Sequence, residues 1–208
     1  SIHDNPSLTD EAIEEFLADV PPEEREAREH GRFLHLAGRV YDAFDDTVHI
    51  TDFDPLVDAQ DIPTTWPVVQ AVDPHDRKPW FMVWAALSPG GDVYVIREWP
   101  DYDYDNIRTG SMGWDEAAEA IDTIEDTIPG GRSRVVRRIM DPNFGVSPKG
   151  GITPQDALAE RGYFFETDVS NKLEPGHTAV RNLLHYDTDE PLSHFNRPKL
   201  FVSESCRN

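Results

Sequence analysis

The chain has 208 residues and a formal net charge of −21, from 40 acidic and 19 basic residues. Hydrophobic residues make up 38% of the sequence, which is enough to bury a core and excludes a disordered tail. The acidic balance argues against a domain that binds nucleic acid through a broad basic surface, so contacts with DNA must come from local basic clusters or from metal ions. Few of the bases are Lys, which also suits a salty host or habitat; a gain in stability at high salt would support that hypothesis.

Cysteine usage and the lack of a long apolar run bound the compartment. Cys206 is the only cysteine, so the chain forms no internal disulfide and no cysteine zinc cluster, as expected in a reducing cytoplasm. No apolar run approaches the roughly 20 residues of a membrane span. The polar start at Ser1 also lacks the pattern of a signal peptide. We therefore expect a protein that acts in the cytoplasm and has no membrane partner.

Residues 1–66 are predicted to form a helical arm or linker. Apolar residues recur at helical spacing before Pro21-Pro22, and a second helix is expected from Pro22 to Gly31. Residues 38–66 are rich in acids and prolines and are predicted to be irregular, with a short extended piece at 48–50. The apolar positions of the first helix are Ile13, Phe16, Leu17 and Val20.

Residues 67–208 are predicted to form the main domain. A buried strand at 68–72 ends in Asp73-Pro74, and strands at 80–87 and 93–99 form a hairpin around the turn 88–92. The later elements alternate: a helix at 114–128, a strand at 135–140, a helix from Thr153 to Gly162, a strand at 164–169, a helix at 175–186 and a strand at 199–203. This order predicts an α/β fold, a mixed sheet with helices on its faces.

Two aspartates stand where apolar strands end, and each is followed by proline. If the strands that end at Asp73 and Asp141 are neighbours, both carboxylates project at one edge of the sheet. Rigid carboxylates so close repel each other unless a cation lies between them, and Mg²⁺ prefers such hard oxygen ligands. A pair of ions held there could activate water against a phosphodiester. Asp-Pro is also common turn chemistry, so an ordinary strand end is the alternative interpretation.

Further acids and bases near these strand ends are weaker candidates. Asp76 could be an accessory ligand or a solvated loop residue, and Glu98 could help hold metal or form a surface salt bridge. The dense basic cluster around Asp141, with Lys149 in the following glycine-rich loop, could grip phosphate or pair with nearby acids. No Walker-type phosphate loop is present, so we expect no ATPase activity. The cluster consists of Arg132, Arg134, Arg137 and Arg138.

Several stretches, in order and spacing, resemble the large terminase subunit of tailed double-stranded DNA viruses. They cover nearly all of the chain. They are Ile2 to Leu8, Glu29 to Phe33, Gly38 to Tyr41, Trp66 to Pro74, Val83-Trp84, Tyr94 to Glu98, Arg181 to Leu184, Pro198 to Phe201 and Cys206 to Asn208.

The resemblance implies the ribonuclease H-like nuclease domain of a genome-packaging motor, which cuts concatemeric double-stranded DNA with Mg²⁺ or Mn²⁺. It implies that Asp73 and Asp141 are the first two catalytic carboxylates and metal ligands, and that Asp76 is a functionally sensitive acid. Arg132, Arg134, Arg138 and Lys149 are the expected DNA contacts. The third carboxylate of the family lies on a helix beyond residue 208, so the C-terminal end of the domain is expected to be incomplete.

In the full-length motor the resemblance also implies portal protein and small terminase partners, in the host cytoplasm during virus assembly. The ATPase domain of the family has no counterpart in this sequence. Two alternatives stay open. Another ribonuclease H-like nuclease, such as a junction resolvase, would share the metal chemistry. An acidic docking module for portal or small terminase would keep the fold without cutting DNA.

Overall fold

The computed structural model describes residues 40–51, 62–75, 80–100, 112–145, 151–170 and 172–206. The chain divides into two compact units, Ser1–Asp42 and Ala43–Asn208, and all the elements below belong to the second. The two helices predicted before residue 32 lie outside the described residues. In the described part, no helix is long and apolar enough to cross a membrane.

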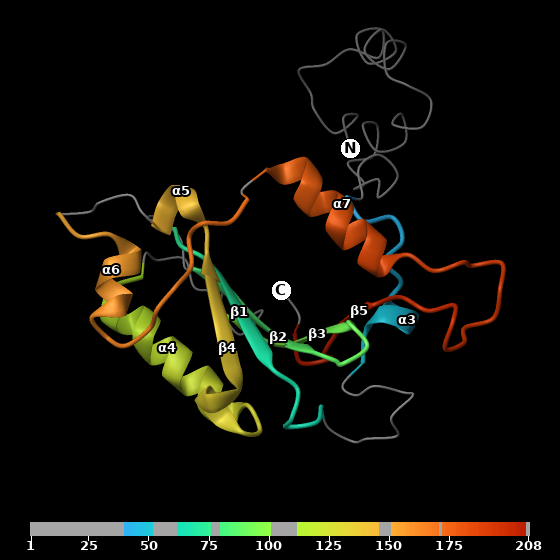
Figure 1. Ribbon diagram of the computed structural model, residues 1–208, viewed down its shortest axis with the longest axis horizontal. Helices are drawn as coiled ribbons and strands as arrows, with labels where there is room; N and C mark the ends of the chain where they lie inside the picture. Colours follow the sequence, from blue (N-terminus) through green and yellow to red (C-terminus); the bar gives the residue numbers. More distant parts are fainter. Residues whose placement is uncertain are drawn as a thin grey trace, which may run out of the picture. The chain divides into compact units, whose positions relative to one another are not determined.

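Five strands form one mixed sheet in the order β4-β1-β2-β3-β5 (Figure 1). β1 pairs antiparallel with β2 and β2 antiparallel with β3, whereas β4 runs parallel to β1 and β5 parallel to β3. The predicted hairpin and the predicted strand ending at Met140 are confirmed. The strands are β1 (Val68–Asp73), β2 (Phe81–Leu87), β3 (Val93–Trp99), β4 (Val135–Met140) and β5 (Leu200–Val202).

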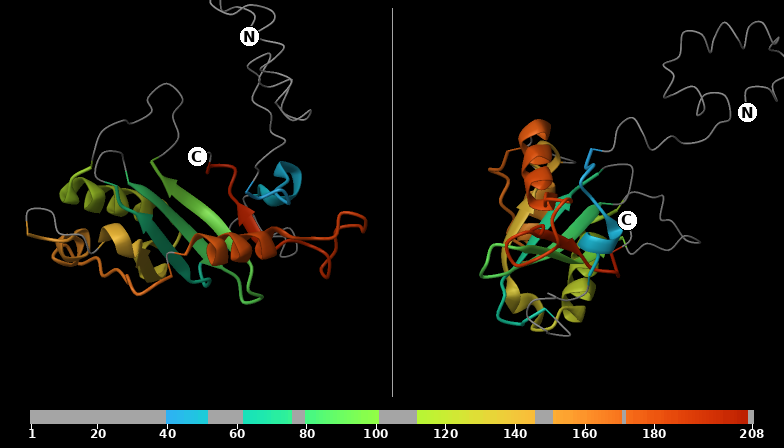
Figure 2. Two further views of the ribbon diagram at one scale, coloured as in Figure 1. Left: turned by 90° about the horizontal axis from the view of Figure 1, so that it is seen from above. Right: turned by 90° about the vertical axis from the view of Figure 1, so that its right-hand side faces the viewer.

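Helices follow the strands much as the sequence predicts. The longest are α4 (Trp114–Thr127) and α7 (Leu173–Leu184), and Figure 2 shows them on opposite sides of the sheet. Thr153 caps α6 through its hydroxyl, as predicted, by accepting from the Asp156 N–H at 3.0 Å. The shorter helices are η2 (Gly131–Arg134), α5 (Pro142–Gly145) and α6 (Pro154–Ala159).

The core lies between the sheet and α4. Alternate residues of β1 are buried, which is the period of a strand with one covered face. Trp84 of β2 and Ile121 and Ile124 of α4 pack in the same cluster. The α4 residues recur at the spacing of one helical face, so the two periods meet in one hydrophobic layer.

Two predicted extended segments differ from the structure. Residues 46–49 form a short helix, α3 (Asp46–His49), because Asp45 caps it and the buried His49 ring bonds to Leu184 O at 2.9 Å. The strand expected at 164–169 shrinks to a single bridge, Ile139 to Glu166. Only two backbone bonds join this segment to β4, Met140 N–H to Glu166 O and Glu166 N–H to Arg138 O.

Candidate metal centre at the ends of β1 and β4

The parallel pairing of β1 and β4 brings Asp73 and Asp141 to the same edge of the sheet. Val72 pairs with Met140, and the Asp141 N–H donates to Val72 O at 3.0 Å. The residue that follows each of this pair is an aspartate, so the two carboxylates extend from neighbouring, parallel strand ends. The neighbourhood that the sequence predicts for these two strands is therefore observed.

The electrostatics of Asp73 reflect this placement. Desolvation raises the pKa of the Asp73 carboxyl above its usual value, and the charge of Asp141 raises it further, whereas His75 lowers it. The repulsion between the two carboxylates means that their side chains lie within reach of each other's field. Two hard oxygen donors whose repulsion a cation would relieve form a donor set that fits Mg²⁺ or Mn²⁺.

Asp141 is held in place by the start of α5. Its carboxylate Oδ1 accepts from the Asn143 N–H at 3.3 Å, and Pro142 begins the helix where its missing N–H costs nothing. The Asp-Pro pair thus ends β4 and starts a short helix within one residue. This turn fixes the direction in which the Asp141 side chain leaves the sheet.

Replacing Asp73 by Asn should raise the free energy of unfolding at pH 7 in the presence of EDTA. The folded-state pKa of Asp73 is raised, so its contribution favours the folded state most below the unfolded pKa and is lost as the pH rises through the folded pKa. Urea unfolding at a series of pH values should show the wild type falling behind Asp73→Asn from about pH 4 upwards. A difference between the two proteins that does not change with pH would contradict the raised pKa.

Other predicted ligands add nothing to this pair within the described residues. Asp76 and Lys149 lie outside them. No group of three or more His, Cys, Asp or Glu residues suited to a metal occurs in the part of the chain that the structure describes. Glu98 is buried, so the surface salt bridge suggested for it is wrong. Its register partner on β2 is Val83, which itself pairs with Ala71 of β1.

Two of the arginines expected to contact DNA are buried instead, which corrects that prediction. Arg134 is 6% exposed and donates to the backbone carbonyls of Trp66, Pro129 and Pro63 at 2.7 to 3.0 Å. Burial lowers the pKa of its guanidinium. Arg138 is 8% exposed and forms an ion pair with Glu125 of α4. Neither guanidinium is available to a phosphate.

The other two arginines of the cluster face outwards. Arg132 lies over the Tyr163 ring, 4.3 Å from its centroid, and donates to Gly162 O at 2.9 Å. Arg137 forms a two-pronged ion pair with Glu166, which raises the pKa of Arg137 and lowers that of Glu166. A DNA contact by Arg132 stays a prediction.

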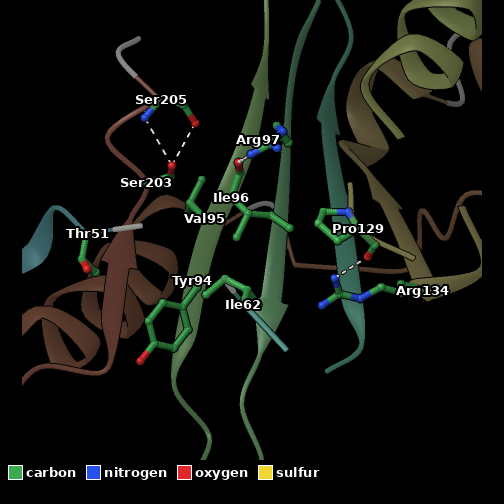
Figure 3. Close-up of a pocket in the computed structure, with 10 residues that line it drawn as sticks. All are labelled: Thr51, Ile62, Tyr94, Val95, Ile96, Arg97, Pro129, Arg134, Ser203 and Ser205. Carbon is green, nitrogen blue, oxygen red and sulfur yellow. Dashed lines mark hydrogen bonds between the residues drawn. The ribbon is translucent and has the colours of Figure 1, made fainter. Parts of the chain in front are cut away.

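A cavity of about 310 Å³ occurs elsewhere, along β3 and β5 (Figure 3). Its polar groups include Arg97, Arg134 and the hydroxyls of Ser203 and Ser205, and no residue of β1 or β4 lines it. Arg97 donates to Thr127 at the end of α4 and to Ile96 O. The cavity is therefore separate from the paired aspartates.

The fold and the paired aspartates together define a ribonuclease H-like architecture: an antiparallel hairpin, a parallel neighbour to its first strand, and carboxylates where those two strands end. No protein-family model and no curated protein matches the chain. Solved structures do. The large terminase of a thermophilic bacteriophage matches 99% of this chain and 44% of its own, with 17% identity and a TM-score of 0.55.

The nuclease domain of the P22 large terminase is the second informative match. It covers 82% of this chain and 74% of its own, with 15% identity and a TM-score of 0.54. The chain therefore has the fold of large-terminase nuclease domains, and both the predicted fold class and the resemblance are confirmed at the level of the fold. The chain spans less than half the length of the thermophilic phage protein.

Proposed function

We propose that this chain is the nuclease domain of a viral DNA-packaging terminase and that it hydrolyses phosphodiester bonds of concatemeric double-stranded DNA with Mg²⁺ or Mn²⁺. The observation that carries the proposal is the pairing of β1 with β4, which sets Asp73 beside Asp141 on a fold shared with terminase nucleases. Asp76 is the accessory acid in this proposal.

The protein's part in the chemistry is to hold charge in place. Asp73 and Asp141 stand on rigid strand ends, so their oxygens are preorganised before any ion arrives. A divalent ion bound by them, or a pair of ions, supplies a Lewis acid for water activation and for the charge on the leaving oxygen. The carboxylates also carry negative charge that keeps DNA away until cations are present, which makes binding of substrate depend on metal.

The DNA contacts in this proposal come from few side chains, because the chain carries a net charge of −21. Arg132 is the exposed arginine near β4, and Lys149 follows Asp141 in sequence. No recognition helix is evident, so cutting should show little sequence preference. In a full-length motor, which would act in the host cytoplasm, portal protein and small terminase are the proposed partners and a separate ATPase domain drives translocation.

The proposal predicts that the purified chain nicks supercoiled plasmid in Mn²⁺ and stops when EDTA is added. Asp73→Ala should lose the activity, because one of the two ligands is gone. The readout is the fraction of plasmid converted to open circles over time on an agarose gel. Equal activity of wild type and Asp73→Ala would remove Asp73 from the site.

The same assay separates the alternatives. Strong preference for four-way junctions over plasmid would indicate a junction resolvase. Calorimetry that detects no Mn²⁺ binding, together with intact binding to a portal ring, would indicate an acidic docking module that does not cut.

A further inference from the structure

A row of polar side chains crosses the hydrophobic core directly beneath the paired aspartates. Gln70 of β1 pairs in register with Trp84 of β2 on one side and with Arg138 of β4 on the other. All three side chains are buried, and Glu125 of α4, only 1% exposed, meets the row from the helix layer. Such groups are expensive to bury unless they bond to each other.

The bonds within this row are complete and close. Arg138 donates to both carboxylate oxygens of Glu125, at 2.5 and 2.9 Å, and also to Gln70 Oε1. Trp84 Nε1 donates to Glu125 Oε1 at 3.0 Å. The Arg138 guanidinium lies 5.1 Å from the centroid of the Tyr163 ring. One contact, Arg138 to Gln70, joins β4 directly to β1.

Stability alone is a poor explanation for this arrangement. Apolar residues of similar size in place of a buried ion pair are often neutral or stabilising, because desolvation offsets the attraction. Buried polar contacts can instead select one register among several, as a single polar residue does in a coiled coil. The question is then which register this row selects.

The β1–β4 ladder needs such a selection. Val68 pairs with Val135 but Val69 pairs with Arg137, so the ladder contains an irregularity at its start. A slip of one residue would turn Arg138 from the α4 face to the other face. It would also move Asp141 along the sheet edge by about 3.3 Å relative to Asp73.

The row lies at the position that controls the rim. Gln70 and Arg138 are register partners, and each precedes its strand's terminal aspartate by three residues. We propose that Gln70, Glu125 and Arg138 are positioning residues, which lock the register of β1 against β4 and so hold Asp73 and Asp141 at the spacing that a shared cation requires. This inference rests on the function proposed above for the two aspartates.

The test is the double variant Glu125→Gln/Arg138→Met. It leaves no buried charge, keeps an acceptor for Trp84, and removes the bond between β4 and Gln70. We expect an unchanged circular dichroism spectrum and cooperative unfolding, with Mn²⁺ affinity at least about 10-fold weaker, on the scale seen when groups that orient metal ligands are lost. Plasmid nicking should lose kcat by a similar factor while KM stays within about twofold.

A matched control makes the same chemical change at the surface. Glu166→Gln/Arg137→Met removes an exposed ion pair between β4 and its outer neighbour. It should leave Mn²⁺ affinity and kcat unchanged, and an equal loss there would overturn the register lock. If the buried double variant does not fold, Gln70→Met alone, which removes only the acceptor on β1, is measured in the same way.

Hydrogen exchange separates this inference from the proposed function. The Asp141 N–H, bonded to Val72 O, should lose protection in the buried variant and keep it in the surface control, whether or not the chain cuts DNA. If the wild type fails to nick but this loss occurs, the lock stands and the nuclease proposal fails. If the buried variant keeps protection, Mn²⁺ affinity and kcat at wild-type values, the lock is wrong.

Discussion

Replacing Arg138 by Met on its own should lower the free energy of unfolding by about 3–5 kcal/mol, the usual loss when one partner of a buried ion pair is removed. Glu125 would stay charged and 1% exposed, with the Trp84 N–H as its remaining donor among the bonds of the buried row. Urea unfolding of both proteins at pH 7, followed by circular dichroism, measures the difference.

Arg137→Met is the matched control for this loss. Arg137 is the preceding residue of the same strand, and it makes the same kind of ion pair at the surface, where such pairs contribute at most about 1 kcal/mol. The two substitutions should therefore differ by several-fold in their cost. Similar losses for both would mean that burial of the Arg138–Glu125 pair does not govern its energetics.

Replacing Asp141 by Asn should lower the rate of Mn²⁺-dependent plasmid nicking by at least about 100-fold, as for loss of one preorganised electrostatic contact in an active site. The amide keeps the shape and an oxygen that can accept from Asn143, so the turn into α5 should survive. The substitution also removes the charge that raises the pKa of Asp73, so the pKa of Asp73 should fall towards its usual value.

An acid on the other side of the fold controls for net charge. Asp126 is an exposed residue of α4, and Asp126→Asn removes the same charge without touching the strand ends. Nicking by Asp126→Asn should match the wild type. If Asp141→Asn also cuts at the wild-type rate while folded, Asp141 is not part of the site.

Much of the sheet could be predicted because its signals are local. Apolar runs ended by Asp-Pro mark β1 and β4, and the Pro-Gly-Gly turn marks the β2–β3 hairpin. The helix α3 could not be predicted from Val48, His49 and Ile50, which favour a strand by local propensity. Its stability comes from the bond between His49 and Leu184, 135 residues apart, and a contact of that kind leaves no local pattern.

The site divides in the same way. The positions of Asp73 and Asp141 follow from strand ends, so the sequence reaches them. The arginine cluster misleads, because a dense run of bases says nothing about which side chains point inwards. Arg138 pairs with Glu125, which lies on a different element, and Arg134 bonds to backbone carbonyls of residues 63 and 66. Gln70 and Glu125 carry no sequence signal at all beyond their place in an apolar pattern.

Divalent-ion binding by the two strand ends is most directly measured by calorimetry with Mn²⁺ on four proteins: wild type, Asp73→Ala, Asp141→Ala and the double variant. Shared coordination predicts saturable binding in the wild type, a large loss in each single variant, and little further loss in the double, because neither carboxylate holds the ion alone. Wild-type affinity in both single variants would contradict it.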